Sequence, residues 1–233
     1  MTAPLTPGFR SRTADRPEDD LGDRRRTAPG RDHGSATLRM DRGHSVLVLV
    51  DYQGRLLTAI HDAERVVERA VFLADVAREL GVPVIGTAQN PTKLGPNVEA
   101  VQSRCADIVE KMHFGACEGG LLERLDALAA EAPSANGARV PENLDVVVAG
   151  CEAHVCLLQT ALGLLEAGRR VWVVSDACGS RDPVDHELAM RRLEAAGAGV
   201  VSSEMVAFEW TLTCEHDRFR AVSALVKGKV LGV

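Results

Sequence analysis

The sequence predicts an α/β protein in which helices cover both faces of a six-stranded parallel sheet, a three-layer α/β/α arrangement. From residue 45 onwards, short apolar runs alternate with amphipathic stretches. Parallel strands need crossover connections, usually helices, and sheets built in this way are buried on both faces. The 233 residues are 45% hydrophobic and 26% charged, which is typical of one globular domain with a substantial core.

The first half of this region predicts three strands, over residues 45–51, 82–88 and 107–111. Apolar residues recur at helical spacing from Ala63 to Leu80, and Gly81 is suited to end that helix. A second helix is predicted over about residues 120–130.

The second half predicts three more strands, over residues 145–149, 170–176 and 199–203. Residues 132–143 contain Pro, Ser, Gly and Asn and are interpreted as a loop. Helices are predicted after Gly150, over residues 184–196 and towards the end of the chain, with no internal repeat and no second domain.

Residues 1–40 differ in composition from the rest. They are rich in Arg, Asp, Pro, Gly and Thr and contain no run able to bury apolar surface, so we expect a disordered tail before a folded domain at 41–233. No apolar stretch follows the basic residues Arg24, Arg25 and Arg26, which argues against a secretory signal or a membrane anchor.

The net charge of −6, the absence of a basic stripe and the 3% aromatic content make nucleic acid an unexpected partner. We expect no membrane partner either. The six cysteines form no Cys-x-x-Cys pair and lack the spacing of small secreted domains. They are interpreted as reduced thiols in a cytoplasmic protein.

Three reactive side chains fall at the ends of predicted strands. Asp51 follows the first strand, Lys111 ends the third, and Cys156 follows the fourth. Singly, each has an ordinary explanation: a turn or capping carboxylate, a solvated ammonium and a small buried thiol. Because the carboxyl ends of parallel strands share one edge of the sheet, their convergence predicts a functional site.

Cys156 lies where the helix after the fourth strand begins. The positive end of a helix dipole can lower a thiol pKa from about 8.5 to about 3.5–7.5, so we expect a reactive thiolate here. Asp51 is suited to take up and return a proton, and Lys111 is suited to stabilise the negative charges. Backbone N–H groups at the start of the helix are suited to bind an oxyanion.

These residues lie in motifs that resemble the isochorismatase-like cysteine hydrolases, most closely the branch of isochorismatase domain-containing proteins. The resemblance covers about residues 44–230 and rests on residues 51–53 (DYQ), 89–95 (QNPTKLG), 111–114 (KMHF), 150–161 (GCEAHVCLLQTA), 175–181 (SDACGSR) and 203–204 (SE). It implies strand order 3-2-1-4-5-6 and a triad of Asp51 (base and acid), Lys111 (electrostatic partner) and Cys156 (nucleophile). It also implies a homo-oligomer and a cis peptide bond between Cys151 and Glu152, with the N–H groups of Glu152 and Cys156 in an oxyanion hole.

Nicotinamidases of this superfamily carry an Asp-x-His metal motif after the second strand, whereas residues 87–91 here read TAQNP. We therefore expect no metal and no cofactor. Gln53 could orient substrate or cap the following helix, and Phe114 and Tyr52 could line a pocket or pack in the core. Cys151 could also pair with Cys156, and His154 could act as a base or as a structural hydrogen-bonding group. Cys105, Cys117, Cys178 and Cys214 are interpreted as packing residues.

The function predicted on these grounds is cleavage of a C–N bond in a small amide, imide or carbamoyl compound through an acyl-enzyme on Cys156. Two alternatives stay open. The first is an isochorismatase-type vinyl ether hydrolase that uses Asp51 alone, and the second is a catalytically silent binding or scaffold protein of the same fold. The sequence does not identify the substrate, because fold alone does not determine specificity.

Overall fold

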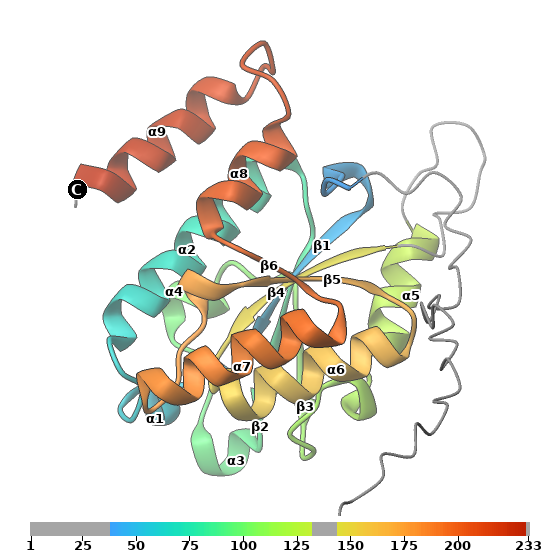
Figure 1. Ribbon diagram of the computed structural model, residues 1–233, viewed down its shortest axis with the longest axis vertical. Helices are drawn as coiled ribbons and strands as arrows, with labels where there is room; N and C mark the ends of the chain where they lie inside the picture. Colours follow the sequence, from blue (N-terminus) through green and yellow to red (C-terminus); the bar gives the residue numbers. More distant parts are fainter. Residues whose placement is uncertain (1–37, 132–143, 232–233) are drawn as a thin grey trace, which may run out of the picture. The chain divides into compact units, whose positions relative to one another are not determined.

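The computed structural model describes residues 38–131 and 144–231 (Figure 1). Within them, six parallel strands form one sheet of order β3-β2-β1-β4-β5-β6, which confirms the predicted fold class and strand order. Residues 1–37 of the predicted tail and the predicted loop at 132–143 lie outside the described residues. Met40 is buried, and its N–H donates to the Glu209 carboxylate at 2.9 Å.

The strands form close to where the apolar runs predict them. They are β1 (Ser45–Val50), β2 (Val84–Gln89), β3 (Asp107–Lys111), β4 (Asp145–Gly150), β5 (Arg170–Val174) and β6 (Gly199–Val201). β2 begins two residues later than predicted, because the N–H of Val82 still donates to Ala77 in the preceding helix and Pro83 has no N–H to donate. Every residue of β1, β2 and β4 is buried, as expected for central strands of a covered sheet.

Helices cover both faces of the sheet (Figure 1). α2, α8 and α9 pack together on one face, and α6 and α7 lie on the other, beside β5 and β6. The longer helices are α2 (Ala63–Leu80), α5 (Leu121–Glu131), α6 (Leu158–Glu166), α7 (Pro183–Ala196), α8 (Ser203–Thr211) and α9 (Phe219–Leu231). The single turns are η1 (Arg42–His44), α1 (Gly54–Leu57), α3 (Pro91–Leu94), α4 (Glu99–Gln102), η2 (Cys117–Gly119) and η4 (Ser175–Ala177).

α2 has the bounds that its apolar spacing predicts. Its stripe of Val66, Ala70, Leu73 and Ala77 is buried, and Gly81 ends the helix in the left-handed conformation at φ 73°. Among the described residues, no helix has the length and apolar character needed to cross a membrane.

The chain after β4 differs from the prediction. The helical region opens at Ala153 with a turn of π-helix, η3 (Ala153–Leu157), and continues directly as α6. Cys156 is therefore the fourth residue of η3 and lies within the first turns of the helical region. Single π-helical turns are frequent at functional sites.

Candidate active site

The candidate site lies at the carboxyl ends of four neighbouring strands, β3, β2, β1 and β4. Lys111 ends β3, Asp51 follows β1, and Cys156 follows β4 through η3. The neighbours β1 and β4 mark the point where the strand order changes direction, because the chain adds β2 and β3 on one side of β1 and β4 on the other. Ligand sites of parallel sheets occur at such a point.

Asp51 and Lys111 form a buried ion pair. The Nζ atom of Lys111 lies 2.8 Å from Oδ2 of Asp51, and neither side chain is exposed. Asp51 has a φ of 55°, in the left-handed region that non-glycine residues seldom occupy, and such residues cluster at functional sites. A buried ion pair persists only where further hydrogen bonds satisfy both groups.

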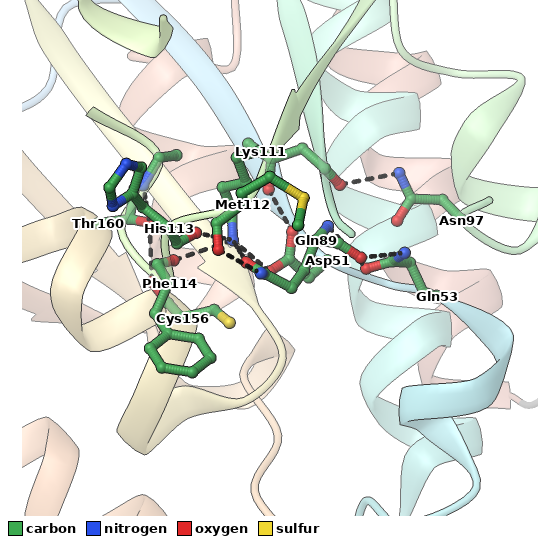
Figure 2. A network of polar contacts seen from close by, with 12 residues as sticks. Asp51, Gln53, Gln89, Asn97, Lys111, Met112, His113, Phe114, Cys156 and Thr160 are labelled. Carbon is green, nitrogen blue, oxygen red and sulfur yellow. Dashed lines mark hydrogen bonds and ion pairs between the residues drawn. The ribbon is translucent and has the colours of Figure 1, made fainter. Parts of the chain in front are cut away.

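Those further hydrogen bonds come from β2 and from the loop after β3 (Figure 2). The Lys111 ammonium donates to Oε1 of Gln89 at 2.7 Å and to the carbonyl oxygen of Phe114 at 2.9 Å, with a longer contact of 3.4 Å to the carbonyl of His113. An ammonium has three N–H donors. Asp51, Gln89 and Phe114 thus supply one close acceptor for each of them.

Sequence reasoning missed Thr87 and Gln89. The Thr87 hydroxyl donates to Oδ1 of Asp51 at 2.6 Å, and both residues are fully buried. Thr87 and Gln89 are two residues apart on β2, so their side chains point to the same face. They stand beside Val50 and Lys111 in the strand register. Two polar residues on one face of the strand between Asp51 and Lys111 were the feature of the sequence that could have indicated these contacts.

Cys156 lies beside this ion pair (Figure 2), but its thiol does not have the character that the sequence predicts. Burial first, and then the charge of Asp51, raise the pKa of Cys156 to about 12, in spite of the opposite effect of Lys111. A hydrogen bond with the Asp51 side chain acts in the same direction as burial. The predicted resting thiolate is therefore wrong: at neutral pH the group is a thiol whose hydrogen-bond partner is a carboxylate.

The segment that leads to Cys156 is held on both sides by backbone hydrogen bonds. The N–H of Cys151 donates to Val50 at 2.9 Å, and the N–H of Ala153 donates to Gly179 at 2.7 Å. The Cys151–Glu152 peptide bond is cis, as the resemblance implies. Cys151 is fully buried, and burial raises the pKa of its thiol well above the usual range.

The Glu152 side chain forms an ion pair with a charged partner. Its Oε1 atom lies 2.6 Å from Nε of Arg181, whose side chain is exposed. His154 is near the same partner: its Nδ1 atom lies 2.9 Å from the Ser180 hydroxyl, and its Nε2 atom lies 3.3 Å from Nη2 of Arg181. These contacts match the structural alternative for His154.

Gln53 and Phe114 occupy very different surroundings. Gln53 is fully buried; its amide donates to the carbonyls of Gln89 and Gly95 at 2.9 and 2.6 Å and accepts from the N–H of Gln89 at 2.9 Å. Its side chain does not cap α1. Phe114 is 54% exposed, so the core-packing alternative is wrong for this ring. Figure 2 shows it on the same side of the network as Cys156.

Of the remaining aromatic and cysteine residues, some are buried as predicted and one is exposed. Tyr52 is in the core, and its hydroxyl donates to the carbonyl of Ala177 at 2.5 Å. Cys178 is buried and Cys105 and Cys117 are partly buried, in agreement with packing roles. Cys214 is exposed, so the packing prediction is wrong for that residue.

Access to the thiol is narrow, because Cys156 is only 3% exposed. Two hollows of about 540 and 500 Å³ lie elsewhere, one along α8 around Met205 and Phe208 and the other around His61 and His186. Asp51, Lys111 and Cys156 line neither of them. Exposed side chains nevertheless adjoin the site, since Met112 (69% exposed) follows Lys111 directly and Phe114 lies two residues further on.

Across the ranges 38–131 and 144–231, no three His, Cys, Asp or Glu side chains gather in the manner of a metal site. The polar groups at the end of β2 are the hydroxyl of Thr87 and the amide of Gln89, both already hydrogen-bonded to the ion pair. Metal independence stays a prediction.

Comparison with known proteins identifies the family of this chain. The family described as "Isochorismatase domain" matches residues 45–205. The chain is 34% identical over 185 residues to isochorismatase domain-containing protein 2 of Bos taurus, covering 79% of this chain and 84% of that protein. It is 28% identical over 188 residues to isochorismatase family protein 1B of Dictyostelium discoideum, covering 78% and 86%.

Solved structures give the same fold. The structure described as MAR1 ribonuclease from Caenorhabditis elegans superposes with a TM-score of 0.70 at 31% identity, over 81% of this chain and 92% of that one. YcaC from Escherichia coli, described as an octameric hydrolase of unknown specificity, superposes with a TM-score of 0.67 at 21% identity, over 85% and 99%. At that identity, the second likeness concerns the fold alone.

Proposed function

The chain belongs to the isochorismatase family and has its hydrolase fold, and from that premise we propose that it hydrolyses a C–N bond in a small amide, imide or carbamoyl compound. The observation that carries the proposal is the buried ion pair of Asp51 and Lys111 beside the thiol of Cys156. A thiol, a base that can accept its proton and a fixed positive charge are the groups that nucleophilic acyl transfer requires.

The first half-reaction makes an acyl-enzyme. Sγ of Cys156 attacks the carbonyl carbon while the thiol proton passes to Asp51, and the N–H groups of Glu152 and Cys156 donate to the oxyanion that forms. Collapse of the tetrahedral intermediate breaks the C–N bond. The leaving nitrogen takes the proton from Asp51, and the acyl group stays on sulfur.

Water completes the cycle. Asp51 takes a proton from the attacking water, the new tetrahedral intermediate expels sulfur, and the proton on Asp51 returns to Cys156. In both half-reactions, Lys111 stays hydrogen-bonded to the Asp51 carboxyl group. Because the pKa of Cys156 is about 12, the thiol does not lose its proton ahead of attack, and a base already hydrogen-bonded to it is needed.

The other predicted site residues have supporting roles in this proposal. Phe114, exposed on the side of Cys156, contacts the substrate. Gln53 holds the backbone at the end of β2, since its amide is engaged with Gln89 and Gly95. Cys151 acts through its backbone, which fixes the approach to Glu152.

One observation favours a second candidate, a binding or scaffold protein without turnover: the 3% exposure of Cys156 leaves little room for a substrate to reach sulfur.

Vinyl ether hydrolysis by Asp51 alone is the third candidate, and it needs no thiol. The ribonuclease description of the C. elegans relative adds RNA hydrolysis as a fourth candidate. We favour a small molecule over RNA because the net charge of this chain is −6.

Three further features complete the proposal. We propose a homo-oligomer, which the octameric assembly of the YcaC relative supports. The six free cysteines support a cytoplasmic location. The side chains at the end of β2, a hydroxyl and an amide, support metal-independent chemistry.

The test is a screen of the full chain against small amides, imides and carbamoyl compounds, followed by variants on the best substrate. Cys156→Ala and Asp51→Asn should abolish turnover while the circular dichroism spectrum is kept. Cys105→Ala, which removes a partly buried thiol outside the site, should retain it. Full activity in Cys156→Ala would contradict the covalent route, and the absence of turnover in the wild type would favour the silent candidate.

A further inference from the structure

The hydrogen bond between Thr87 and Asp51 can reverse its direction, whereas the ion pair with Lys111 cannot. Asp51 accepts three described interactions in the site: from the Thr87 hydroxyl, from the Lys111 ammonium and from the Cys156 thiol. An ammonium only donates, whereas a hydroxyl can donate or accept. Thr87 is therefore the one neighbour, among the described partners of Asp51 other than the reacting thiol, that can adapt to either protonation state of the carboxyl group.

We propose that Thr87 is a positioning residue that holds the Asp51 carboxylate for proton transfer and keeps the carboxyl group satisfied in both of its protonation states. The inference rests on the proposed function, in which Asp51 alternates between carboxylate and carboxylic acid. When Asp51 is ionised, the Thr87 hydroxyl donates to Oδ1. When Asp51 carries the proton taken from Cys156, the hydroxyl rotates and accepts a hydrogen bond from it, and no proton moves to Thr87.

Burial makes this adaptability important. Asp51 and Thr87 are both inaccessible to solvent, so water does not solvate the carboxyl group when its charge changes. A buried polar group without a partner costs about 1–3 kcal/mol. A fixed donor alone would favour only the ionised form and would oppose the step in which Asp51 receives a proton.

Backbone hydrogen bonds around Thr87 hold this residue, and with it the hydroxyl oxygen, in a fixed position. The carbonyl of Thr87 accepts hydrogen bonds from the N–H of Asp51 at 3.3 Å and from the Asn97 amide at 3.1 Å. Thr87 also lies within β2, paired with Val50, the residue before Asp51. Thr87 and Asp51 are thus linked by a main-chain and a side-chain hydrogen bond. Together these two hydrogen bonds set the orientation of the carboxylate towards the thiol.

The experiment compares Thr87→Val, Thr87→Ser and Thr211→Val in the full chain, on the substrate found by the amide screen. Thr87→Val keeps the shape and removes the hydroxyl; Thr87→Ser restores the hydroxyl. Thr211→Val is the matched control, because its buried hydroxyl donates at 2.6 Å to the carbonyl of Ala207 in α8. Its neighbour Trp210 contacts Ser45, at the opposite end of β1 from Asp51.

We expect kcat of Thr87→Val to fall roughly ten- to a hundredfold with little change in KM, because proton transfer by a positioned group contributes about 10²–10⁴ in rate. The acid limb of the pH profile of kcat/KM should move to higher pH, because the hydroxyl binds the ionised carboxylate more strongly than the neutral acid, so its removal costs the ionised form more. The other titratable groups facing Asp51 are Lys111 on β3, Cys156 in η3 and Cys151 after β4, and all remain in the variant. Thr87→Ser should restore both the rate and the profile.

Unchanged kcat and pH profile in a folded Thr87→Val would overturn the role of Thr87 while leaving the proposed function intact. Equal losses in Thr87→Val and Thr211→Val would also overturn it, since the effect would then be one of stability. If Thr87→Val does not fold, a Thr87→Ser variant with a wild-type profile supports the role, and one with a large loss of kcat contradicts it. Absence of turnover in the wild type would overturn this inference together with the proposed function.

Discussion

Nζ of Lys111 lies 2.8 Å from Oδ2 of Asp51, and both side chains are completely buried. The two residues end strands that are not neighbours, since β2 lies between β1 and β3. The pair therefore spans the side chains of β2, and Thr87 and Gln89 contact one charged group each. Because charges are costly to bury, this arrangement makes strong predictions about what happens when one member is removed.

Lys111→Met should lower the free energy of unfolding by about 3–5 kcal/mol, because it leaves the Asp51 carboxylate buried without a cation. Urea unfolding at neutral pH measures the change. Lys93→Met, the same substitution at an exposed lysine, should have little effect. The double variant Lys111→Met with Asp51→Asn should recover much of the loss, and a double variant less stable than Lys111→Met would contradict this account of the pair.

Asp51→Asn should lower the pKa of Cys156 from about 12. The substitution removes the negative charge that raises this pKa and leaves the Lys111 ammonium, which lowers it. The pH dependence of alkylation by iodoacetamide, followed at Cys156 by peptide mass spectrometry, gives the midpoint. Cys178, with a pKa of about 12 set by burial, is an internal reference that should not change. If the pH midpoint of Cys156 alkylation were the same in Asp51→Asn and the wild type, the charge of Asp51 would not raise the pKa of this thiol.

The free energy of unfolding should fall as the pH rises above about 9. Burial raises the pKa of Cys178 to about 12, above the value of about 8.5 for an unfolded cysteine. A group whose pKa is raised by folding stabilises the protein fully below its unfolded pKa, and this stability is lost as pH rises towards the folded value.

Cys178→Ala is the variant that tests this dependence. Relative to the wild type, its free energy of unfolding should fall less steeply between about pH 9 and 11, by at most about 1.4 kcal/mol per pH unit. Cys214→Ala, at an exposed thiol, should keep the wild-type slope. Parallel pH dependences for wild type and Cys178→Ala would contradict the assignment.

Gly150→Ala should destabilise the protein by about 1–3 kcal/mol or more, because a Cβ atom at the end of β4 would lie 2.4 Å from the carbonyl oxygen of Val50. The same strand end leads to Cys151 and Cys156, so turnover should fall as well. Gly54→Ala is the control, because its Cβ would meet only Val98, at 4.0 Å. Thermal unfolding and turnover of both variants test the prediction, and equal stability of the two would count against it.

Most of the fold follows from local patterns in the sequence. α2 and β3 have the predicted bounds, since helical and strand periodicities in those segments agree with the residues that end them. The ends of β5 and β6 were predicted too far along the chain. Ser175–Ala177 forms a single helical turn and Ser203 begins α8, because Ser202 caps that helix by accepting from the N–H of Met205.

The site was less predictable than the fold. Convergence of Asp51, Lys111 and Cys156 followed from strand order, but the high pKa of the thiol depends on burial and on the direction of the Asp51 side chain. Thr87 and Gln89 are ordinary strand residues by type. Their roles arise from the register between β2 and its neighbours, which a single sequence does not specify.

The most direct test of the central claim is the mass of the intact protein after rapid quenching with an amide substrate from the screen. The account predicts an added mass equal to the acyl group, located on the peptide that contains Cys156 and absent in Cys156→Ala. Steady turnover with no adduct at any quench time, together with undiminished turnover in Cys156→Ala, would contradict it.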